Sequence, residues 1–396
     1  MNRELQNKKQ DKTFFIVVQI LISVLMILFT LTSQPSLTSA MFALSFITLL
    51  LLYFSTFRGG KINSACWPLL IWSFVSILLS YFGGNKSFVL SDLISYITFV
   101  AAVLFMQIAT YIEVTKKMAH MILFLGMASA VLYPIGFYLL HANVFRGAFL
   151  TMNFSNPNLT GVYLAQACLY SILGFFLQKR KTVKIIAVAV FALDMYLLYL
   201  TDARNALLAV VLALGAMIWA MLGRVKHFNK GMILFIAVFP FLFAVLYLLF
   251  IEAIESSGRL DFIIGEAKTL DSRVRIWERV FKNLKGIHWI IGDFTKIRGN
   301  MHNTHLTILG SYGLIGLWMM IKYLNDIMNE VNRRIRSSTQ AMCMICFFGT
   351  IFMGNGEAAL FYGGMGIYAI ACSYLILARY DWEHDCEIPS VPVEEM

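Results

Sequence analysis

Residues 231–251 read GMILFIAVFPFLFAVLYLLFI, and this stretch decides the class of fold. It runs for 21 residues without a charged side chain, and about 20 apolar residues are needed to cross the hydrocarbon core of a bilayer. Lipid offers the backbone no hydrogen bonds, so an isolated spanning segment must satisfy its own backbone groups as a helix. The stretch therefore predicts a transmembrane helix.

The composition of the whole chain extends this conclusion beyond one segment. Of 396 residues, 59% are hydrophobic and 14% are charged, whereas a soluble globular protein carries about 25% charged residues. Too few polar side chains are present to cover the surface of a soluble domain of this length. The composition therefore argues against a soluble enzyme, a nucleic-acid-binding protein and a disordered scaffold.

Hydropathy predicts an all-α, polytopic transmembrane bundle of about twelve spans. The span at 338–353 is the shortest, and the N-terminal span is too long for the apolar core of a signal peptide, so we expect it to be retained. In chain order the predicted spans lie near 13–32, 37–57, 65–82, 88–112, 118–140, 159–178, 183–201, 205–222, 231–251, 303–321, 338–353 and 361–378.

The basic residues predict the orientation of these spans. If the N-terminus is cytoplasmic, the inner segments hold 20 Lys and Arg, and the short outer loops hold only Lys86, Arg146 and Arg204. Short cytoplasmic loops carry the excess of basic residues in membrane proteins, and long loops are exempt from this rule. Both termini are therefore predicted to be cytoplasmic. The net charge of +10 is mostly a topology signal and gives little support to nucleic-acid binding.

This topology divides the chain into four parts. Residues 1–251 hold the first nine spans, 252–302 form a long external loop, and 303–378 hold the last three spans. Residues 379–396 form an acidic cytoplasmic tail with two prolines. A polar tail of this composition is expected to be a disordered chain end.

Polar side chains that could carry chemistry collect at the outer ends of the predicted spans. Such groups are costly in lipid, so their position is informative, although several could simply cap helices or anchor them at headgroups. The inner loops show no comparable grouping. The outward group comprises Asp92, Arg146, Asn153, Asn156, Asn158, Asp202, Arg204, Asn205, His302, Asn303, His305 and Glu357.

The external loop contains a segment with the spacing of an amphipathic helix. In residues 271–284, DSRVRIWERVFKNL, one stripe includes Trp277, and another holds Arg275, Arg279 and Lys282. Two interpretations remain open. The segment is either an interfacial helix with its cations on lipid phosphates, or a lid over an outward cavity whose arginines bind an anionic ligand through their bidentate forks.

The segment after this loop carries the most specific pattern in the chain. Residues 302–317 read HNTHLTILGSYGLIGL. This resembles the H-N-x-x-L-x-x-L-x-x-x-G-x-x-G-L signature of the bacterial O-antigen ligase and Wzy-type polysaccharide polymerase superfamily. As in that family, the signature follows a long external loop and opens a predicted transmembrane helix.

Three further elements resemble the same family, in the same order along the chain. Residues 202–208, DARNALL, are similar to its S-R-x-A-L-L element, with Ala203 where serine is usual. Residues 146–158 resemble, with looser spacing, an R-x-x-G element followed by N-P-N. In the external loop, Arg273, Trp277 and Gly292 resemble the family's pattern of Arg, Trp and a glycine turn.

The resemblance implies a GT-C-type membrane fold that acts on undecaprenyl-pyrophosphate-linked oligosaccharide, without a nucleotide sugar, a required metal or another cofactor. It places His302 at the family's histidine position, where a histidine is suited to take the proton of the attacking hydroxyl. Attack opposite the departing pyrophosphate would invert the anomeric centre. The candidate catalytic residues are His302, Arg204 and Arg273. The candidate substrate-binding residues are Arg146, Arg275, Asn156, Asn158, Asn303, His305, Asp202 and Glu357.

Three functions remain open from the sequence. The first is a polymerase that joins lipid-linked repeats at the outer face of the membrane, with a flippase and a chain-length regulator as partners. The second is a ligase that moves a finished glycan from the same donor to another acceptor. The third is a secondary transporter or a flippase, which would favour repeated halves and binding groups at the midplane; the chain shows neither feature. If histidine is not the base, Glu357 or Asp202 is the alternative.

Overall fold

The structure is a computed structural model, and it describes most of the chain from residue 64 onward. The predicted spans at 13–32 and 37–57 lie outside the described residues, as does the tail beyond residue 383. The described ranges are 64–83, 90–111, 114–140, 145–152, 156–256, 268–294, 301–357, 359–362 and 365–383.

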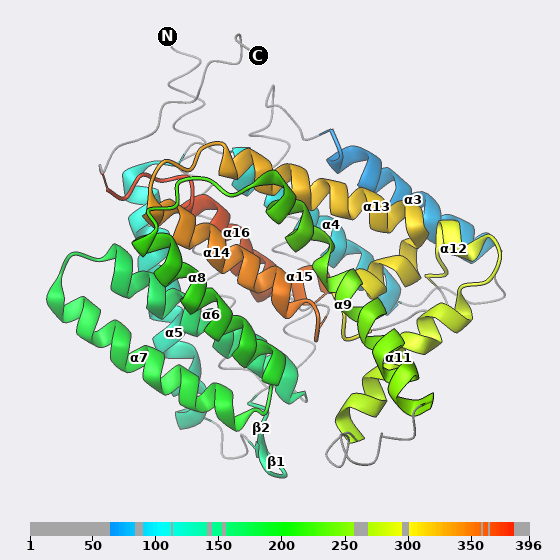
Figure 1. The fold of residues 1–396 in the computed structure, drawn as a ribbon, viewed down its shortest axis with the longest axis horizontal. Coiled ribbons are helices and arrows are strands. Elements are labelled where there is room, and N and C mark those ends of the chain that lie inside the picture. Colours follow the sequence, from blue (N-terminus) through cyan, green and yellow to red (C-terminus); the bar gives the residue numbers. More distant parts are fainter. Residues whose placement is uncertain are drawn as a thin grey trace, which may run out of the picture.

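The described residues form a bundle of helices, drawn in Figure 1. One short β-hairpin, β1 (Phe145–Arg146) with β2 (Phe149–Leu150), is an addition to the all-α expectation. The helices are α3 (Cys66–Phe82), α4 (Leu90–Tyr111), α5 (Lys116–Leu140), α6 (Pro157–Leu177), α7 (Lys181–Leu200), α8 (Arg204–Leu222), α9 (Lys230–Ser256), α11 (Lys268–Asn283), α12 (His288–Ile291), α13 (Thr304–Asn332), α14 (Ser338–Met353), α15 (Ala359–Tyr362) and α16 (Met365–Leu377).

Each predicted span within the described ranges overlaps a helix, although the last is divided between α15 and α16. Five of the described helices, α6, α7, α8, α9 and α13, are long and apolar enough to cross a membrane. Three apolar helical segments, in α3, α4 and α14, are shorter. The helical class is therefore confirmed, and the chain fits a membrane-embedded protein, whereas the count of twelve spans remains a prediction.

The helices differ in how much apolar surface they leave uncovered. α6 and α13 are largely buried, and α6 packs against α5, α7 and α8. In contrast, α7, α8 and α9 have few buried residues and leave many large apolar side chains exposed. Exposed apolar faces of this extent are unfavourable in water and are suited to lipid. The bundle thus has an inner set of helices and an outer set that would contact the bilayer.

Helix α13 continues well beyond the predicted span, which was expected to end near residue 321. Its last part occupies much of the segment that was predicted to be a cytoplasmic loop. Here Lys322 Nζ lies 2.6 Å from Asp326 Oδ2, and Arg334 Nη2, just after the helix, lies 2.6 Å from Glu330 Oε1. Oppositely charged pairs four residues apart stabilise a solvated helix. Hydropathy could not detect this extension, because charged and polar residues interrupt its apolar side chains, which are buried against other helices.

A kink at Gly313 bends α13, with φ at 70° and ψ at −172°. A kink frees backbone carbonyls, and neighbouring groups satisfy them here. The Gly310 carbonyl accepts from the Asp293 N–H at 2.8 Å, and the Tyr312 carbonyl accepts from Trp72 Nε1 at 2.9 Å. A Cβ atom added at Gly313 would lie 2.1 Å from the Ile290 carbonyl oxygen. The position therefore requires glycine both for its backbone conformation and for its space.

Gly313→Ala is expected to destabilise the protein by about 1–3 kcal/mol, the cost of a residue held in this region of φ and ψ, and by more where the clash cannot relax. The measurement is thermal unfolding in detergent. Gly215→Ala is the matched control: Gly215 lies inside α8 with open space at its Cβ, and alanine is the better helix former. Equal stability of the two variants would show that the kink does not depend on Gly313.

The beginning of the C-terminal tail is packed, contrary to the expected disorder. Tyr380 and Trp382 are buried, and their rings meet edge to face at a centroid distance of 4.9 Å. His120 of α5 contacts both rings, and Arg379 Nη1 donates to the Ala109 carbonyl at 2.9 Å. The prediction of a disordered tail was therefore wrong for residues 379–383, because these aromatic side chains find partners on distant helices.

Candidate functional site

The site is built around the residue that precedes α13. Asn303 is the N-cap of this helix: its Oδ1 accepts from the Leu306 N–H at 2.9 Å. Asn303 Nδ2 also donates to the Pro240 carbonyl in α9 at 2.9 Å. His302, just before the cap, has φ at +51°, in the left-handed region that few residues other than glycine adopt. The hydrogen bonds of Asn303 therefore fix the position of the His302 backbone, from which the imidazole extends.

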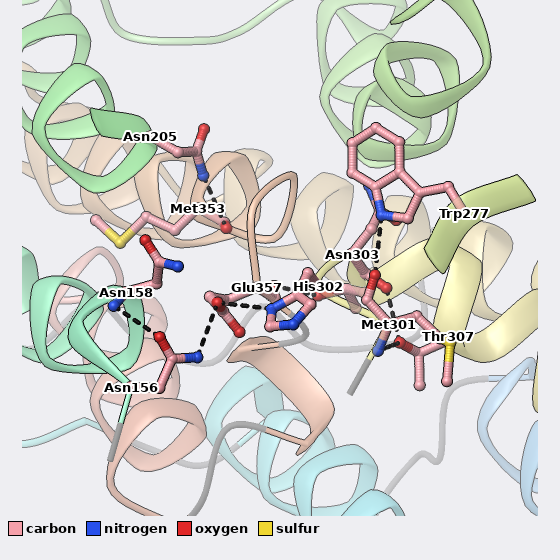
Figure 2. A network of polar contacts seen from close by, with 11 residues as sticks. Asn156, Asn158, Asn205, Trp277, Met301, His302, Asn303, Thr307, Met353 and Glu357 are labelled. Carbon is pink, nitrogen blue, oxygen red and sulfur yellow. Dashed lines mark hydrogen bonds and ion pairs between the residues drawn. The ribbon is translucent and has the colours of Figure 1, made fainter. Parts of the chain in front are cut away.

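His302 pairs with Glu357, as Figure 2 shows. The distance from His302 Nδ1 to Glu357 Oε1 is 2.9 Å. The Glu357 side chain is only 3% exposed, whereas that of His302 is 26% exposed. Asn156 Nδ2 donates to the same Glu357 oxygen at 3.3 Å. A buried carboxylate thus lies behind a histidine that remains accessible.

This geometry determines which ring nitrogen can act as a base. Ionised Glu357 only accepts hydrogen bonds, so the neutral imidazole carries its proton on Nδ1, on the Glu357 side. The lone pair is then on Nε2, which can accept a proton from a hydroxyl group. The carboxylate would also stabilise the imidazolium that forms. A histidine oriented by a carboxylate is an arrangement suited to general base catalysis.

The turn that carries Glu357 is hydrogen-bonded to the start of α13. The Thr304 N–H donates to the Gly354 carbonyl at 2.9 Å, and Thr304 Oγ1 donates to the Glu357 carbonyl at 3.4 Å. These bonds join α13 to the turn after α14, although the two segments are about 50 residues apart in sequence. They place His302 and Glu357 opposite each other.

The predicted N-P-N element proves to be a helix start. Asn156 is the N-cap of α6, and its Oδ1 accepts from the Asn158 N–H at 2.9 Å. Pro157 occupies the first helical position, where no backbone N–H is needed. Asn156 therefore caps α6 with its oxygen and contacts Glu357 with its nitrogen. Asn158 contributes its backbone to the same cap.

Arg204 and Asp202 lie at the start of α8, between the predicted spans at 183–201 and 205–222. Arg204 Nε is 3.2 Å from Asp202 Oδ1, and both side chains are well exposed. The next residue, Asn205, donates from Nδ2 to the Met353 carbonyl at 3.0 Å. A Cβ atom at Gly356 would lie 2.8 Å from Asn205 Nδ2. Asn205 therefore attaches the helix of Arg204 to the turn that holds Glu357.

Arg273 and Arg275 lie on α11, the predicted amphipathic helix. Its apolar stripe packs inward, with Trp277 and Val280 buried, so the stripe is covered by protein. Arg273 is half-buried and lies close enough to Tyr247 of α9 for an electrostatic interaction, whereas Arg275 is exposed. Because protein covers the apolar stripe, this structure disfavours the interpretation of a helix that rests its apolar face on lipid.

His305 lies in a different environment from His302. It is fully buried, and its Nε2 donates to the Ala237 carbonyl of α9 at 2.7 Å. Pro240 lies inside α9 and donates no backbone hydrogen bond there. Asn303 and His305 at the start of α13 donate to the Pro240 and Ala237 carbonyls of this part of α9. His305 therefore belongs to the contact between α9 and α13.

The remaining candidates are placed only in part. The backbone of Arg146 lies in β1, and the hairpin leads into the start of α6, where Thr160 Oγ1 donates to the Thr151 carbonyl at 2.6 Å. Asn153 lies outside the described residues, and the position of the Arg146 side chain is not described. Arg146 as a substrate-binding residue stays a prediction.

Neither metal ligands nor known relatives identify the site. Within the described ranges, no group of three or more His, Cys, Asp or Glu side chains could hold a metal ion. Comparisons with protein-family models, with curated proteins and with solved structures find no match to this chain. The functional argument therefore depends on the site itself.

Proposed function

We propose that this chain is a membrane glycosyltransferase that polymerises undecaprenyl-pyrophosphate-linked oligosaccharide repeats at the outer face of the cytoplasmic membrane. The His302–Glu357 pair carries the proposal, because it joins an accessible histidine to a buried carboxylate. The pattern that begins at His302 and resembles the O-antigen ligase and Wzy-type polymerase superfamily supports the same function. The proposal includes three structural features: a GT-C-like helical architecture, twelve membrane spans, and both termini in the cytoplasm.

In the proposed reaction, His302 Nε2 takes the proton of the attacking sugar hydroxyl. Glu357 holds the ring and stabilises the imidazolium. The hydroxyl oxygen bonds to the anomeric carbon as the bond to the pyrophosphate breaks, and undecaprenyl pyrophosphate leaves with both bonding electrons. Attack from the opposite side inverts the anomeric centre. The departing group needs its charge neutralised more than it needs a proton, and arginines are suited to this role.

Three long helices begin at this end of the bundle, and their N-termini support the proposal that the substrate is an anion. α6 begins beside Asn156, α8 begins at Arg204, and α13 begins just after His302. A helix N-terminus carries a partial positive charge and favours phosphate groups nearby. Together with Arg204 and Arg273, these helix starts would attract a pyrophosphate to the vicinity of the base.

The test of this function is a transfer assay with purified protein. The donor is the lipid-linked oligosaccharide that accumulates in the native host when the gene for this chain is deleted. A polymerase should convert this donor into a ladder of glycan lengths, detectable by mass spectrometry. A single transfer to another acceptor would favour a ligase, and movement of the donor across a bilayer without chemistry would favour a flippase. Either result would contradict the polymerase proposal.

Arg204→Ala and Arg273→Ala are each expected to lower the transfer rate about 100-fold, the scale for losing one donor that stabilises developing charge. Lysine should restore activity only in part, because an ammonium lacks the bidentate fork. The exposed Arg204–Asp202 pair contributes little to stability, so the rate loss of Arg204→Ala should occur without unfolding. Arg180→Ala, at the exposed start of α7, is the control. An unchanged rate in Arg204→Ala would remove this residue from the site.

The proposed orientation predicts which surface residues react with a membrane-impermeant thiol reagent. The five described cysteines are buried, so a Cys386→Ser background should label weakly. Lys285→Cys, exposed after α11, should label in intact cells. Lys226→Cys, exposed between α8 and α9, should label only after the membrane is opened. The opposite pattern would place the whole site in the cytoplasm and contradict the proposal.

A further inference from the structure

Trp277 joins the external-loop helix α11 to the residue before His302. Its indole is 2% exposed and meets the rings of Phe243 and Tyr247 of α9 edge to face, with centroids 6.4 and 5.7 Å away. From this fixed position Trp277 Nε1 donates a hydrogen bond of 2.9 Å to the Met301 carbonyl. Figure 2 shows the indole joined to Met301, with Asn205 on the other side of His302. The contact links two segments that are 24 residues apart.

The Met301 backbone is held on both of its polar groups. Its N–H donates to Thr307 Oγ1 at 3.4 Å, and its carbonyl accepts from Trp277. Thr307 Oγ1 in turn donates to the Asn303 carbonyl at 2.8 Å. Both neighbours of His302 are therefore held by hydrogen bonds: Met301 before it and the N-cap residue Asn303 after it.

The peptide group between Met301 and His302 controls where the imidazole points. Rotating this peptide changes φ of His302, which is +51°. A residue other than glycine in this region has an intrinsic energetic cost, and the surrounding structure must maintain it. The value of φ sets the angle between the Met301 peptide and the His302 Cα–Cβ bond, so with Met301 anchored the imidazole keeps its direction toward Glu357. The Trp277 N–H is placed to prevent this rotation.

We infer that Trp277 is a positioning residue for the base: its indole N–H holds the peptide between Met301 and His302 and thereby keeps the imidazole aligned with Glu357. This inference rests on the proposed function of His302. It assigns to α11 a role distinct from charge neutralisation by Arg273, because the contact is a hydrogen bond from a buried indole N–H to the backbone. Trp277 acts through His302 and has no proposed contact with substrate.

The test compares Trp277→Phe with Trp289→Phe. Phenylalanine at position 277 keeps an aromatic ring against α9 and removes the N–H. Trp289, of α12, packs on Phe281 at a centroid distance of 5.8 Å and serves as the matched control. With the native lipid-linked donor, Trp277→Phe should lower kcat about 100-fold, the loss expected when a reacting group is displaced by about 1 Å. Its KM should stay close to that of the wild type, and Trp289→Phe should change neither value.

A double-mutant cycle separates positioning from a general loss of structure. In the His302→Ala background, Trp277→Phe should add no further loss, because the residue acts only through the histidine. An equal loss in both backgrounds would overturn the inference. Thr307→Val provides a second route: it removes the acceptor of the Met301 N–H with little change in shape, and it should lower kcat only when His302 is present. If Trp277→Phe fails to fold, Thr307→Val still tests whether anchoring of Met301 positions the base, and an unchanged kcat in this variant would overturn the inference.

The outcomes also separate the inference from the function on which it rests. If His302→Ala is inactive and Trp277→Phe matches Trp289→Phe, the positioning role is wrong and the base assignment stands. If His302→Ala transfers glycan at the wild-type rate, both the base assignment and the positioning role are overturned. If Trp277→Phe instead raises KM and leaves kcat unchanged, Trp277 is a binding residue and the positioning role is wrong.

Discussion

Replacing His302 with alanine is expected to lower the rate of glycan transfer by about two to four orders of magnitude, the usual scale for a positioned proton transfer. The His302 side chain is partly exposed, and the residue lies before the first turn of α13. Its replacement should therefore leave the fold intact. Initial rates with the native lipid-linked donor measure this effect.

His305→Ala is the control for this prediction, and it should behave in the opposite way. His305 is buried and donates to the Ala237 carbonyl, so its removal leaves a buried acceptor unsatisfied. Such a loss costs about 1–3 kcal/mol of stability. We therefore expect a lower unfolding temperature in detergent and a near-normal rate per folded molecule. If His305→Ala instead loses the chemistry while His302→Ala keeps it, the base has been assigned to the wrong histidine.

Glu357→Ala is expected to lower the rate by up to about 10⁴-fold, the scale seen when a catalytic histidine loses its orienting carboxylate. The ring would lose the acceptor that keeps the proton on Nδ1, and the imidazolium would lose its counter-charge. Glu357 does not contact the departing group in this account, so the affinity for the donor should change little. The measurement is kcat and KM with the same donor as for His302→Ala.

Glu357→Gln separates orientation from charge. Asn156 Nδ2 donates to the oxygen that also faces His302, so it should keep the glutamine carbonyl oxygen in that position. The ring orientation would then survive while the counter-charge is lost, and we expect a smaller loss of rate than in Glu357→Ala. Asn156→Ala combined with Glu357→Gln should lose more, because the amide can then turn its NH₂ group toward the ring. Equal rates for the alanine and glutamine variants would contradict this division of roles.

The helices could be predicted from hydropathy, since each predicted span within the described ranges corresponds to a helix. What hydropathy missed depends on partners that are distant in sequence. The kink at Gly313 exists because Trp72 and Asp293 satisfy the freed carbonyls. Likewise, Tyr380 and Trp382 are buried because His120 lies on a neighbouring helix, and a local count of charged residues could not show this.

The candidate site could be predicted as a set of residues but not as an arrangement. His302 and Glu357 were both candidates, and their pairing follows only from the contact between the start of α13 and the turn after α14. Asn205 was placed in the outward group, but no role could be assigned to it, since its contact with the Met353 carbonyl is tertiary. His305 is one turn beyond His302 in sequence, yet it points into the packing against α9.

We propose that His302 and Glu357 drive glycan transfer from a lipid pyrophosphate. One reaction of the purified protein tests this role when new glycosidic bonds and released undecaprenyl pyrophosphate are measured together. We expect equal amounts of the two products, an inverted anomeric centre, and a loss of both products in the double variant His302→Ala, Glu357→Ala. Turnover that persists at the wild-type rate in the folded double variant would contradict it.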